Sequence, residues 1–293
     1  MTTNTAVAKL NGYIVLLRPK QWIKNLFVYA AALFSGFILR PDYFFTVLAA
    51  FIYFCMISSA VYILNDLVDI ESDRIHPRKK YRPLAAGTVS LKGALLLLFI
   101  LAAAAIGLSF RLSYSFGIIV VLYLLNNLLY SFFVKHVVII DVMSISLGFL
   151  FRVVGGAVVI GVYVSPWLLL CTLMLALFLG FCKRRNELAI IGENDAIHRK
   201  ILAHYSLSFI DNMLSIITAS TVLSYSLYTF LESKNKYMMV TVLFVLYGIF
   251  RYQYLIYNKN QGESPEEIVL TDKPLMINIV LWTLSMVLIL YII

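Results

Sequence analysis

The sequence predicts an all-α, polytopic membrane protein, and three observations lead to this class. The 293 residues are 61% hydrophobic and only 13% charged, which is about half the charged fraction of an ordinary soluble domain. Apolar runs of about 20 residues, enough to cross a bilayer as a helix, recur along the chain. The cations gather in a few segments between these runs, so no soluble region remains that could bind a nucleic acid.

Nine runs are present, and we expect nine transmembrane helices around a central cavity in one domain, residues 1–293. The runs cover residues 22–39, 44–64, 91–110, 113–134, 137–161, 166–182, 208–231, 237–257 and 275–293. If the N-terminus is cytoplasmic, 19 of the 24 Lys and Arg residues lie on the cytoplasmic side, four lie on the other side, and Arg152 is inside a run. The positive-inside rule therefore predicts a multi-pass protein of the plasma (inner) membrane whose active site faces the cytoplasm. The first dozen residues contain no h-region of a signal peptide, and the three Cys residues show neither disulfide nor zinc spacing.

The most informative stretch is residues 65–73 (NDLVDIESD), named here the acidic segment. It follows the second apolar run, so we expect it to continue that helix. Asn65, Asp69 and Asp73 are spaced four residues apart, and on a helix Asp66 shares their face. Three carboxylates this close repel one another unless a cation lies between them, and Mg²⁺ prefers oxygen ligands and binds substrate phosphates. The segment therefore predicts a Mg²⁺ site at Asp66, Asp69 and Asp73, which we take as the catalytic residues.

A cationic run, RKKYR at residues 78–82, comes next, after Pro77 is expected to stop the helix. Guanidinium and ammonium groups bind phosphate, so Lys79 and Arg82 are candidate substrate ligands, together with Asn65. The alternative is a solvated loop whose charges only set the topology. That alternative explains the cations but not the acidic face on a membrane helix.

The stretch before the first run, RPKQWIKN at residues 18–25, places Lys20 and Lys24 one helical turn apart, on a face shared with Gln21 and Asn25. Anchoring in lipid headgroups is one explanation. The two amides favour substrate binding instead, because they add hydrogen-bonding capacity without anchoring charge. All four residues are therefore candidate substrate ligands.

Three polar features lie in the middle of the chain. Asn127 and Tyr130 lie near the cytoplasmic end of the fourth run, where either helix packing or substrate binding explains them. Asp141 lies inside the fifth run, and its partner is either Arg152, three helical turns further on, or the substrate. The glycine pair at residues 155–156 is expected to permit close helix packing.

Residues 183–187 (KRRNE), named here the basic segment, follow the sixth run. The segment stands four helices after the acidic segment in an equivalent place, so we expect the two to face each other across the cavity. Lys183, Arg184 and Glu187 lie within one helical turn and are candidate substrate ligands. The last cytoplasmic loop, residues 258–274, is expected to be a solvated surface segment.

The nine runs and the NDxxDxxxD pattern of the acidic segment resemble the UbiA superfamily of intramembrane prenyltransferases. In its prenyl-transferring members, a second motif of DxxxD type follows the sixth helix, and the two motifs hold a prenyl diphosphate through Mg²⁺. This chain carries the basic segment there instead. That difference, together with the RPKQWIKN stretch, HPRK at residues 76–79 and SPEEI at residues 264–268, is similar to the branch of decaprenyl-phosphate-type phosphoribosyltransferases. The similarity covers nearly the whole chain.

The resemblance implies a UbiA-type fold and a Mg²⁺-dependent enzyme that moves 5-phosphoribose from phosphoribosyl pyrophosphate (PRPP) to a polyprenyl phosphate and releases pyrophosphate, chemistry of the kind used in cell wall biosynthesis. The residues agree with this chemistry, because the acidic segment suits a metal-bound diphosphate and the two further phosphates need cations. Those cations are expected to be Lys20, Lys24, Lys79, Arg82, Lys183 and Arg184. The attacking phosphate oxygen is ionised near pH 7, so no general base is required. The expected partners are PRPP, the polyprenyl phosphate and the bilayer, and a homo-oligomer is left open.

Two other functions fit parts of the sequence. A UbiA-type prenyltransferase would move a polyprenyl group from its diphosphate to an aromatic acceptor, but it would carry a second pair of aspartates where this chain has the basic segment. A transporter of an anionic metabolite would show helices broken near the midplane by Gly or Pro in two matching repeats, whereas the Pro residues here lie at helix ends and in loops.

Overall fold

The computed structural model describes residues 10–190, 200–233, 235–259 and 265–292, and the part of the chain that it describes is helical apart from turns and short connections. Within these described residues, eight helices are long and apolar enough to cross a membrane. The spans are Pro41–Val68, Leu91–Leu112, Tyr114–Phe132, Ile140–Val159, Pro166–Ala189, Leu207–Glu232, Lys236–Lys259 and Lys273–Tyr291. The all-α, multi-pass prediction is therefore confirmed, with eight long helices in place of nine.

The first apolar run differs most from the expected straight helix. It forms a 3₁₀ helix, η1 (Pro19–Tyr29), followed by a short α-helix, α2 (Ala30–Phe34). Arg18 precedes η1 in the left-handed conformation, with φ 53° and ψ 58°. The residue before a proline is disfavoured in the right-handed helical region, so the chain turns at Arg18 before η1 begins.

The other elements follow in chain order and agree with the remaining runs to within a few residues, except at the end of the sixth. They are α3 (Pro41–Val68), α4 (Ile70–Ile75), η2 (Lys79–Tyr81), α5 (Leu91–Leu112), α6 (Tyr114–Phe132), η3 (Val134–His136), α7 (Ile140–Val159), α8 (Pro166–Ile190), η4 (Lys200–His204), α9 (Leu207–Leu227), η5 (Tyr228–Glu232), η6 (Lys236–Thr241), α10 (Val242–Lys259), α11 (Pro265–Thr271) and α12 (Lys273–Tyr291). Helix α8 continues beyond the sixth apolar run and includes the basic segment, as the spacing of Lys183, Arg184 and Glu187 within one helical turn predicted.

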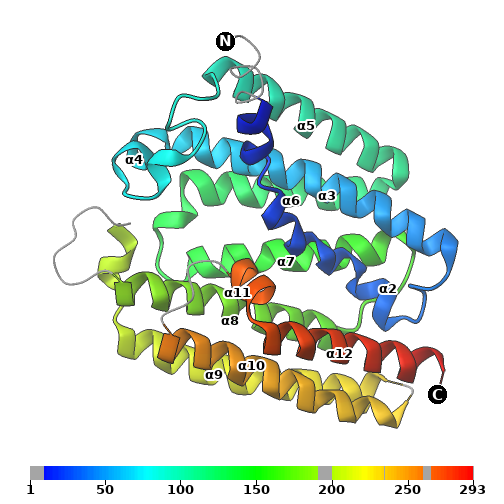
Figure 1. Ribbon diagram of the computed structural model, residues 1–293. Helices are drawn as coiled ribbons and strands as arrows, with labels where there is room; N and C mark the ends of the chain where they lie inside the picture. Colours follow the sequence, from blue (N-terminus) through cyan, green and yellow to red (C-terminus); the bar gives the residue numbers. More distant parts are fainter. Residues whose placement is uncertain (1–9, 191–199, 234, 260–264, 293) are drawn as a thin grey trace.

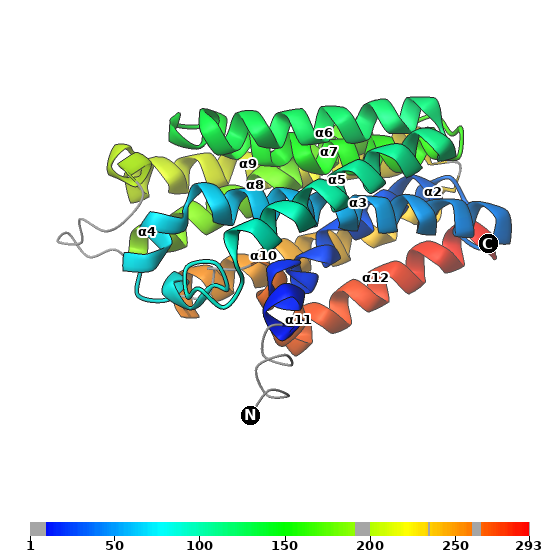
Figure 2. The ribbon, with the colours of Figure 1, turned by 90° about the horizontal axis from the view of Figure 1, so that it is seen from above.

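The packing contacts between the helices close into a ring, and Figures 1 and 2 show the helix bundle from two sides. Helices α3 and α5 to α10 pack each against the next, α12 packs against α10, and α11 joins α12 to η1, which packs against α3 and α7. The acidic segment, α4 and η2 lie at one end of the bundle, and α2 and the C-terminus lie at the other (Figure 1). The polar segments therefore gather at one end of the ring.

Helix α7 approaches η1 very closely, and a glycine makes this possible. A Cβ atom on Gly156 would lie 1.8 Å from the carbonyl oxygen of Val28, and one on Gly155 would lie 2.9 Å from the ring of Phe54. Any side chain at Gly156 would push η1 away from α7. The prediction that this glycine pair permits close packing is confirmed.

Candidate functional site

A cavity of about 1130 Å³ lies inside the ring and is lined mainly by apolar side chains of η1, α2, α3, α6, α7, α8, α10, α11 and α12. Eight cationic residues also line it, from segments far apart in the sequence: Arg18, Lys24, Lys79, Arg82, Lys135, Arg152, Lys183 and Arg184. Among the described residues, two carboxylates accompany them in the wall, those of Asp69 and Glu266. The cavity therefore combines a large apolar volume with a strong excess of positive charge.

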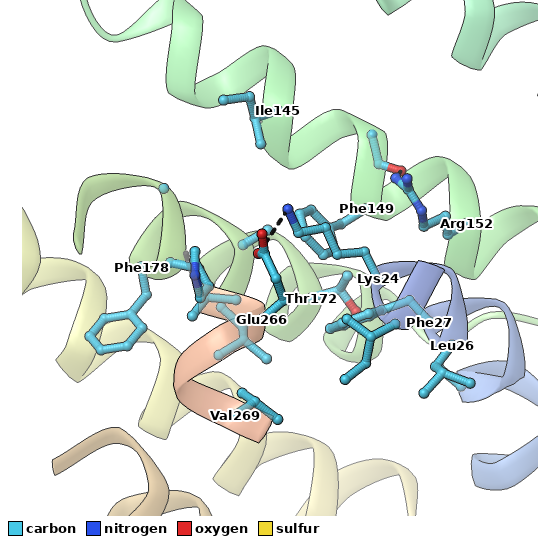
Figure 3. A pocket seen from close by; sticks show the side chains of 18 of the residues that line it. Lys24, Leu26, Phe27, Ile145, Phe149, Arg152, Thr172, Phe178, Glu266 and Val269 are labelled. Carbon is cyan, nitrogen blue, oxygen red and sulfur yellow. Dashed lines mark hydrogen bonds and ion pairs between the residues drawn. The ribbon is translucent and has the colours of Figure 1, made fainter. Parts of the chain in front are cut away.

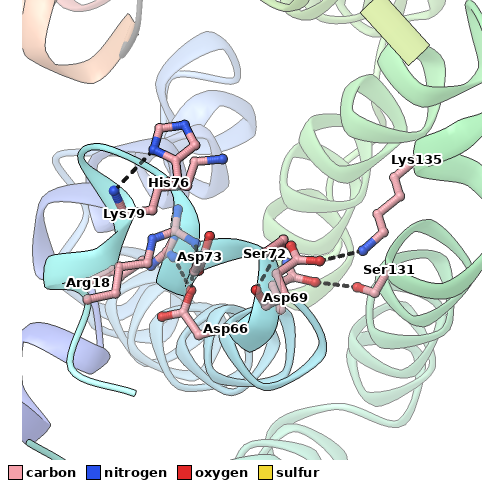
Figure 4. A network of polar contacts seen from close by, with 11 residues as sticks. Arg18, Asp66, Asp69, Ser72, Asp73, His76, Lys79, Ser131 and Lys135 are labelled. Carbon is pink, nitrogen blue, oxygen red and sulfur yellow. Dashed lines mark hydrogen bonds and ion pairs between the residues drawn. The ribbon is translucent and has the colours of Figure 1, made fainter. Parts of the chain in front are cut away.

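The two outer aspartates of the acidic segment share one cation. Nη1 of Arg82 lies 3.1 Å from Oδ1 of Asp66 and 2.6 Å from Oδ2 of Asp73. Arg18 also donates to Asp66 Oδ1, from just before η1 (Figure 4). Both aspartates are buried. Two guanidinium groups thus hold these carboxylates together at the cavity end.

Asn65 and Asp69 of the acidic segment point the other way, toward α6 and η3. Nζ of Lys135 lies 2.7 Å from Oδ1 of Asp69, and the Ser131 hydroxyl donates to Oδ1 of Asn65 (Figure 4). Helix α3 ends at Val68, and Asp69 has φ −95° and ψ 9° at the junction with α4. The prediction of one unbroken helix face is therefore wrong at this residue, although the amide of Asp69 still bonds to the carbonyl of Asn65.

The acidic segment consequently forms two groups in this structure. In the part of the chain that is described, no three Asp, Glu, His or Cys side chains gather as a metal site would require. The geometry brings Asp66 and Asp73 together and directs Asp69 toward Lys135 on η3.

Helix α11 contributes a buried carboxylate that faces η1 across the cavity (Figure 3). Glu266 accepts a hydrogen bond from the Gln21 amide on Oε1, and Nζ of Lys24 lies 3.2 Å from its Oε2. Lys24 Nζ also donates to Gln21 Oε1 at 2.6 Å. Burial acts to raise the pKa of Glu266, but the charge of Lys24 and hydrogen bonds from its own backbone amide and from Gln21 outweigh burial and lower that pKa. The prediction of a solvated loop over residues 258–274 is therefore wrong at Glu266, because α11 docks on the cavity mouth.

The basic segment is only partly directed at the cavity. Lys183 and Arg184 line the wall, but Arg184 is 1% exposed, and its Nε lies 2.8 Å from Oδ2 of Asp141. Arg184 also donates to Glu187 one turn later on α8. Two carboxylates thus neutralise this guanidinium.

Tyr205, which follows the basic segment in the sequence, completes the network of hydrogen bonds around Asp141. The Tyr205 hydroxyl donates to Oδ1 of Asp141 at 3.1 Å and accepts from the amide of Ile139 at 2.7 Å. Burial raises the pKa of Tyr205 to about 12, so the hydroxyl keeps its proton near neutral pH. Arg185 lies on another side of α8, where its Nε is 2.7 Å from Oδ1 of Asp211.

Arg152 has neutral partners, so the sequence-based pairing with Asp141 is wrong. Its Nε, Nη1 and Nη2 donate to Asn25 Oδ1 at 2.7 Å, the Gly148 carbonyl at 2.7 Å and the Tyr123 hydroxyl at 3.0 Å. The eleven-residue separation from Asp141 did suggest similar faces, but Asp141 is already held by Arg184. Asn25 is fully buried and positions Arg152 instead of lining the cavity.

The remaining predicted ligands divide into two groups. Asn65, Lys79, Asn127 and Tyr130 line the cavity. Lys20 is exposed and lies 3.9 Å from Glu267, and Gln21 and Glu187 act on Glu266 and Arg184. Sequence reasoning missed Arg18, Lys135 and Glu266 as wall residues. Arg18 and Glu266 stood in the quoted stretches RPKQWIKN and SPEEI, so the signal was present; Ser264 of the latter lies outside the described residues.

Comparison with known proteins supports the fold and the relationship. The UbiA prenyltransferase family matches residues 25–270. The chain is 34% identical over 288 residues to a decaprenyl-phosphate phosphoribosyltransferase of Mycolicibacterium smegmatis, with 93% of this chain and 90% of the relative covered. It is also 34% identical over 292 residues to a protein of that name from Corynebacterium glutamicum, with 96% and 87% covered.

Among solved structures, the fold is similar to that of a UbiA homologue of Archaeoglobus fulgidus bound to GPP and Mg²⁺. The TM-score is 0.73 and the identity 18%, over 96% of this chain and all of that one. The family match and the two relatives each span most of the chain. The chain therefore belongs to the UbiA prenyltransferase family and is a multi-pass membrane protein.

Proposed function

We propose that this protein transfers 5-phosphoribose from PRPP to a polyprenyl phosphate of the decaprenyl type and releases pyrophosphate. The observation that carries the proposal is the cavity itself, which joins a cation-rich end to a large apolar volume. A donor with two phosphorylated ends and an acceptor lipid with a phosphate headgroup need both properties at once. The names of the two relatives agree with this chemistry. We also propose that the cation-rich end faces the cytoplasm from a plasma (inner) membrane, as the positive-inside rule favours.

The carboxylate oxygens of the acidic segment are suitable ligands for Mg²⁺. Asp66 and Asp73 already converge on a single cationic nitrogen, Nη1 of Arg82, and carboxylate oxygens are ligands that Mg²⁺ prefers. Asp66, Asp69 and Asp73 would hold the ion. When bound, Mg²⁺ would neutralise charge on the diphosphate as it leaves.

The protein's own side chains would bind and align the two substrates. Lys79 and Arg82 would bind phosphate of the donor, and their position in the cavity wall, which Lys24 and Lys183 also line, supports this role. In the reaction, the bond from the anomeric carbon to the diphosphate oxygen breaks, and a bond from that carbon to an oxygen of the lipid phosphate forms. The electron pair leaves with pyrophosphate and no proton moves, so alignment and charge neutralisation are the main contributions.

The rival function, transfer of a polyprenyl group to an aromatic acceptor, predicts a second carboxylate cluster in the wall opposite the acidic segment. The basic segment presents Lys183 there, and its Glu187 is occupied by Arg184. This difference favours a donor and an acceptor that both carry phosphate.

A labelling experiment tests the proposal. Purified protein is incubated with Mg²⁺ and PRPP that is radiolabelled in the ribose, and the organic phase is counted. We expect label in that phase only when a polyprenyl monophosphate is supplied. Polyprenyl diphosphate with 4-hydroxybenzoate should give no product. Transfer of label from the prenyl chain to the aromatic acid would replace the proposed function with its rival.

A further inference from the structure

Two polar atoms in the cavity wall are buried without a hydrogen-bond partner. Among the described residues, three buried side-chain polar atoms have none: Oγ of Ser109, Oη of Tyr252 and Oε2 of Glu266. Tyr252 and Glu266 both line the cavity, and Tyr252 belongs to the same hydrophobic cluster as Ile268, which lies on α11 with Glu266. Because a buried polar atom without a partner costs free energy, two such atoms in one wall indicate a site for a ligand group.

The carboxylate of Glu266 is fixed in place by η1. Gln21 donates to Oε1, and Lys24 lies 3.2 Å from Oε2 in a contact whose angle is not that of a hydrogen bond. The Glu266 side chain is 5% exposed. Its other neighbours keep the carboxylate ionised, so Oε2 is available as a hydrogen-bond acceptor for a group inside the cavity.

The substrates of the proposed function offer few groups that such an acceptor could bind. The diphosphate, the 5-phosphate and the lipid phosphate are anions, and a carboxylate repels each of them. The polyprenyl chain is apolar. The ribose hydroxyls remain, and carboxylates commonly accept hydrogen bonds from them.

Tyr252 complements this acceptor. A sugar hydroxyl both donates and accepts a hydrogen bond. It can donate its proton to the Glu266 carboxylate while its oxygen accepts a hydrogen bond from the Tyr252 hydroxyl. We propose that Glu266 and Tyr252 together bind a ribose hydroxyl of the donor and thereby select a ribosyl over a deoxyribosyl donor. This inference rests on the proposed function and adds a specificity determinant to it.

A purely structural reading gives Glu266 the task of docking α11 on η1 through Gln21 and Lys24. That reading accounts for Oε1 and for the ion pair of Oε2 with Lys24, but it leaves Oε2 and the Tyr252 hydroxyl without a hydrogen bond. The two readings differ in a measurable way. Docking affects all donors equally, whereas hydroxyl binding affects only donors that carry the hydroxyl.

The test compares kcat/KM for PRPP with kcat/KM for its 2-deoxy and 3-deoxy analogues in wild type, Glu266→Gln and Tyr252→Phe. The ratio of PRPP to analogue is formed within each protein and then compared between proteins, which cancels the intrinsic reactivity of each analogue. For at least one analogue, we expect this preference to fall by about tenfold or more in Glu266→Gln, since hydrogen bonds to charged groups are the stronger ones. In Tyr252→Phe we expect a fall of about threefold to tenfold.

Glu267→Gln is the matched control, because Glu267 is the next residue on α11, is 59% exposed and faces Lys20. Its donor preference should equal that of wild type. Tyr252→Phe removes only one oxygen and keeps the ring that packs on Phe178 at 5.5 Å, so it remains informative if Glu266→Gln folds poorly.

Three results would overturn the inference: equal losses for all donors, an unchanged preference in both variants, or a shift only in the Mg²⁺ concentration dependence of Glu266→Gln, which would make it a metal ligand. The proposed function fails separately, if wild type moves no ribose label into lipid at all. A wild type that transfers ribose, with variants of unaltered preference, rejects only the role of Glu266 and Tyr252.

Discussion

The acidic segment at the end of α3 and the basic segment on α8 border the same cavity, but their charges have different partners. In the acidic segment, each aspartate is contacted by a cation that itself lines the cavity: Arg18 and Arg82 for Asp66, Arg82 for Asp73 and Lys135 for Asp69. In the basic segment, Arg184 is held by Asp141 and Glu187, neither of which lines the cavity. The carboxylates of the acidic segment are therefore paired with cations of the cavity wall, whereas Arg184 of the basic segment is paired with carboxylates that lie outside that wall.

This difference in partners shows that the charged residues of a sequence do not by themselves tell which side chains are able to bind a ligand. In the proposed function, the cations on Asp66 and Asp69 would exchange these carboxylates for phosphates of the substrate. Arg184 cannot do so without leaving Asp141 buried and unpaired, which is costly. Within the basic segment, Lys183 is therefore the better candidate for a phosphate ligand.

The largest expected effect comes from the acidic segment. Asp69→Asn or Asp73→Asn should lower turnover by about 10²-fold or more, because each removes a carboxylate from the proposed metal site. The variants should still insert and purify, and EDTA should inactivate wild type until Mg²⁺ is restored. Glu71→Gln is the control, since Glu71 is exposed and pairs with Arg74 at 2.9 Å. Full activity in EDTA would contradict the assignment.

The next effect concerns stability, and it tests the scaffold role of Arg184. Asp141→Asn removes one of the two carboxylates that neutralise the buried Arg184 guanidinium and leaves Glu187, so we expect the free energy of unfolding to fall by up to about 3–5 kcal/mol. Denaturant titration in detergent measures this loss. Asp211→Asn is the matched variant, because it breaks the more exposed pair with Arg185 and should cost about 1 kcal/mol or less. Equal losses in the two variants would remove the distinction between the buried and exposed pairs.

A smaller effect is expected at Lys183. Lys183→Ala should raise KM for PRPP or for the lipid phosphate by about tenfold with kcat little changed, because it removes one charge-assisted hydrogen bond to phosphate. Lys20→Ala should leave both KM values unaltered, since Lys20 is 78% exposed and points at Glu267. If Lys183 only anchors α8 in lipid headgroups, kinetics in detergent will not change.

The smallest effect comes from an ion pair outside both segments, which gives a baseline for the comparison. The hydrogen bond from Arg251 lowers the pKa of Asp272, which also caps α12 through the amide of Leu275 at 2.9 Å. A lowered folded-state pKa stabilises the protein above the unfolded-state value of about 4 and ceases to do so as the pH falls through the folded value. Asp272→Asn should therefore lower Tm slightly at pH 7, and the difference from wild type should shrink below about pH 4. A difference that grows on acidification would have the wrong sign.

The sequence predicted the parts of this molecule that depend on local patterns. Apolar run length predicted the eight long helices, and the position of residues 65–73 directly after the second apolar run placed the acidic segment at the end of α3. Lys183 and Arg184 of the basic segment line the same cavity as Asp69 of the acidic segment, and the expectation that the two segments face each other stays a prediction. Periodicity also predicted Lys24 as a wall residue.

The rest depends on contacts between distant segments, which spacing does not encode. Asp141 pairs with Arg184, 43 residues later, instead of with Arg152. Glu266 looked solvated because its neighbours are polar, and only the docking of α11 on η1, 245 residues from Gln21, buries it. The turn of Asp69 toward Lys135 follows from a backbone change at a single residue, which a regular helical projection cannot show.

The 3₁₀ geometry of η1 has a consequence for the length that the first apolar run covers. A 3₁₀ helix rises about 2.0 Å per residue and an α-helix about 1.5 Å. The 11 residues of η1 and the 5 of α2 therefore reach about 30 Å, the thickness of the hydrocarbon core. Sixteen residues therefore cover a length for which an α-helix needs about 20, so the first apolar run is about as long as the hydrocarbon core is thick although it forms no long α-helix.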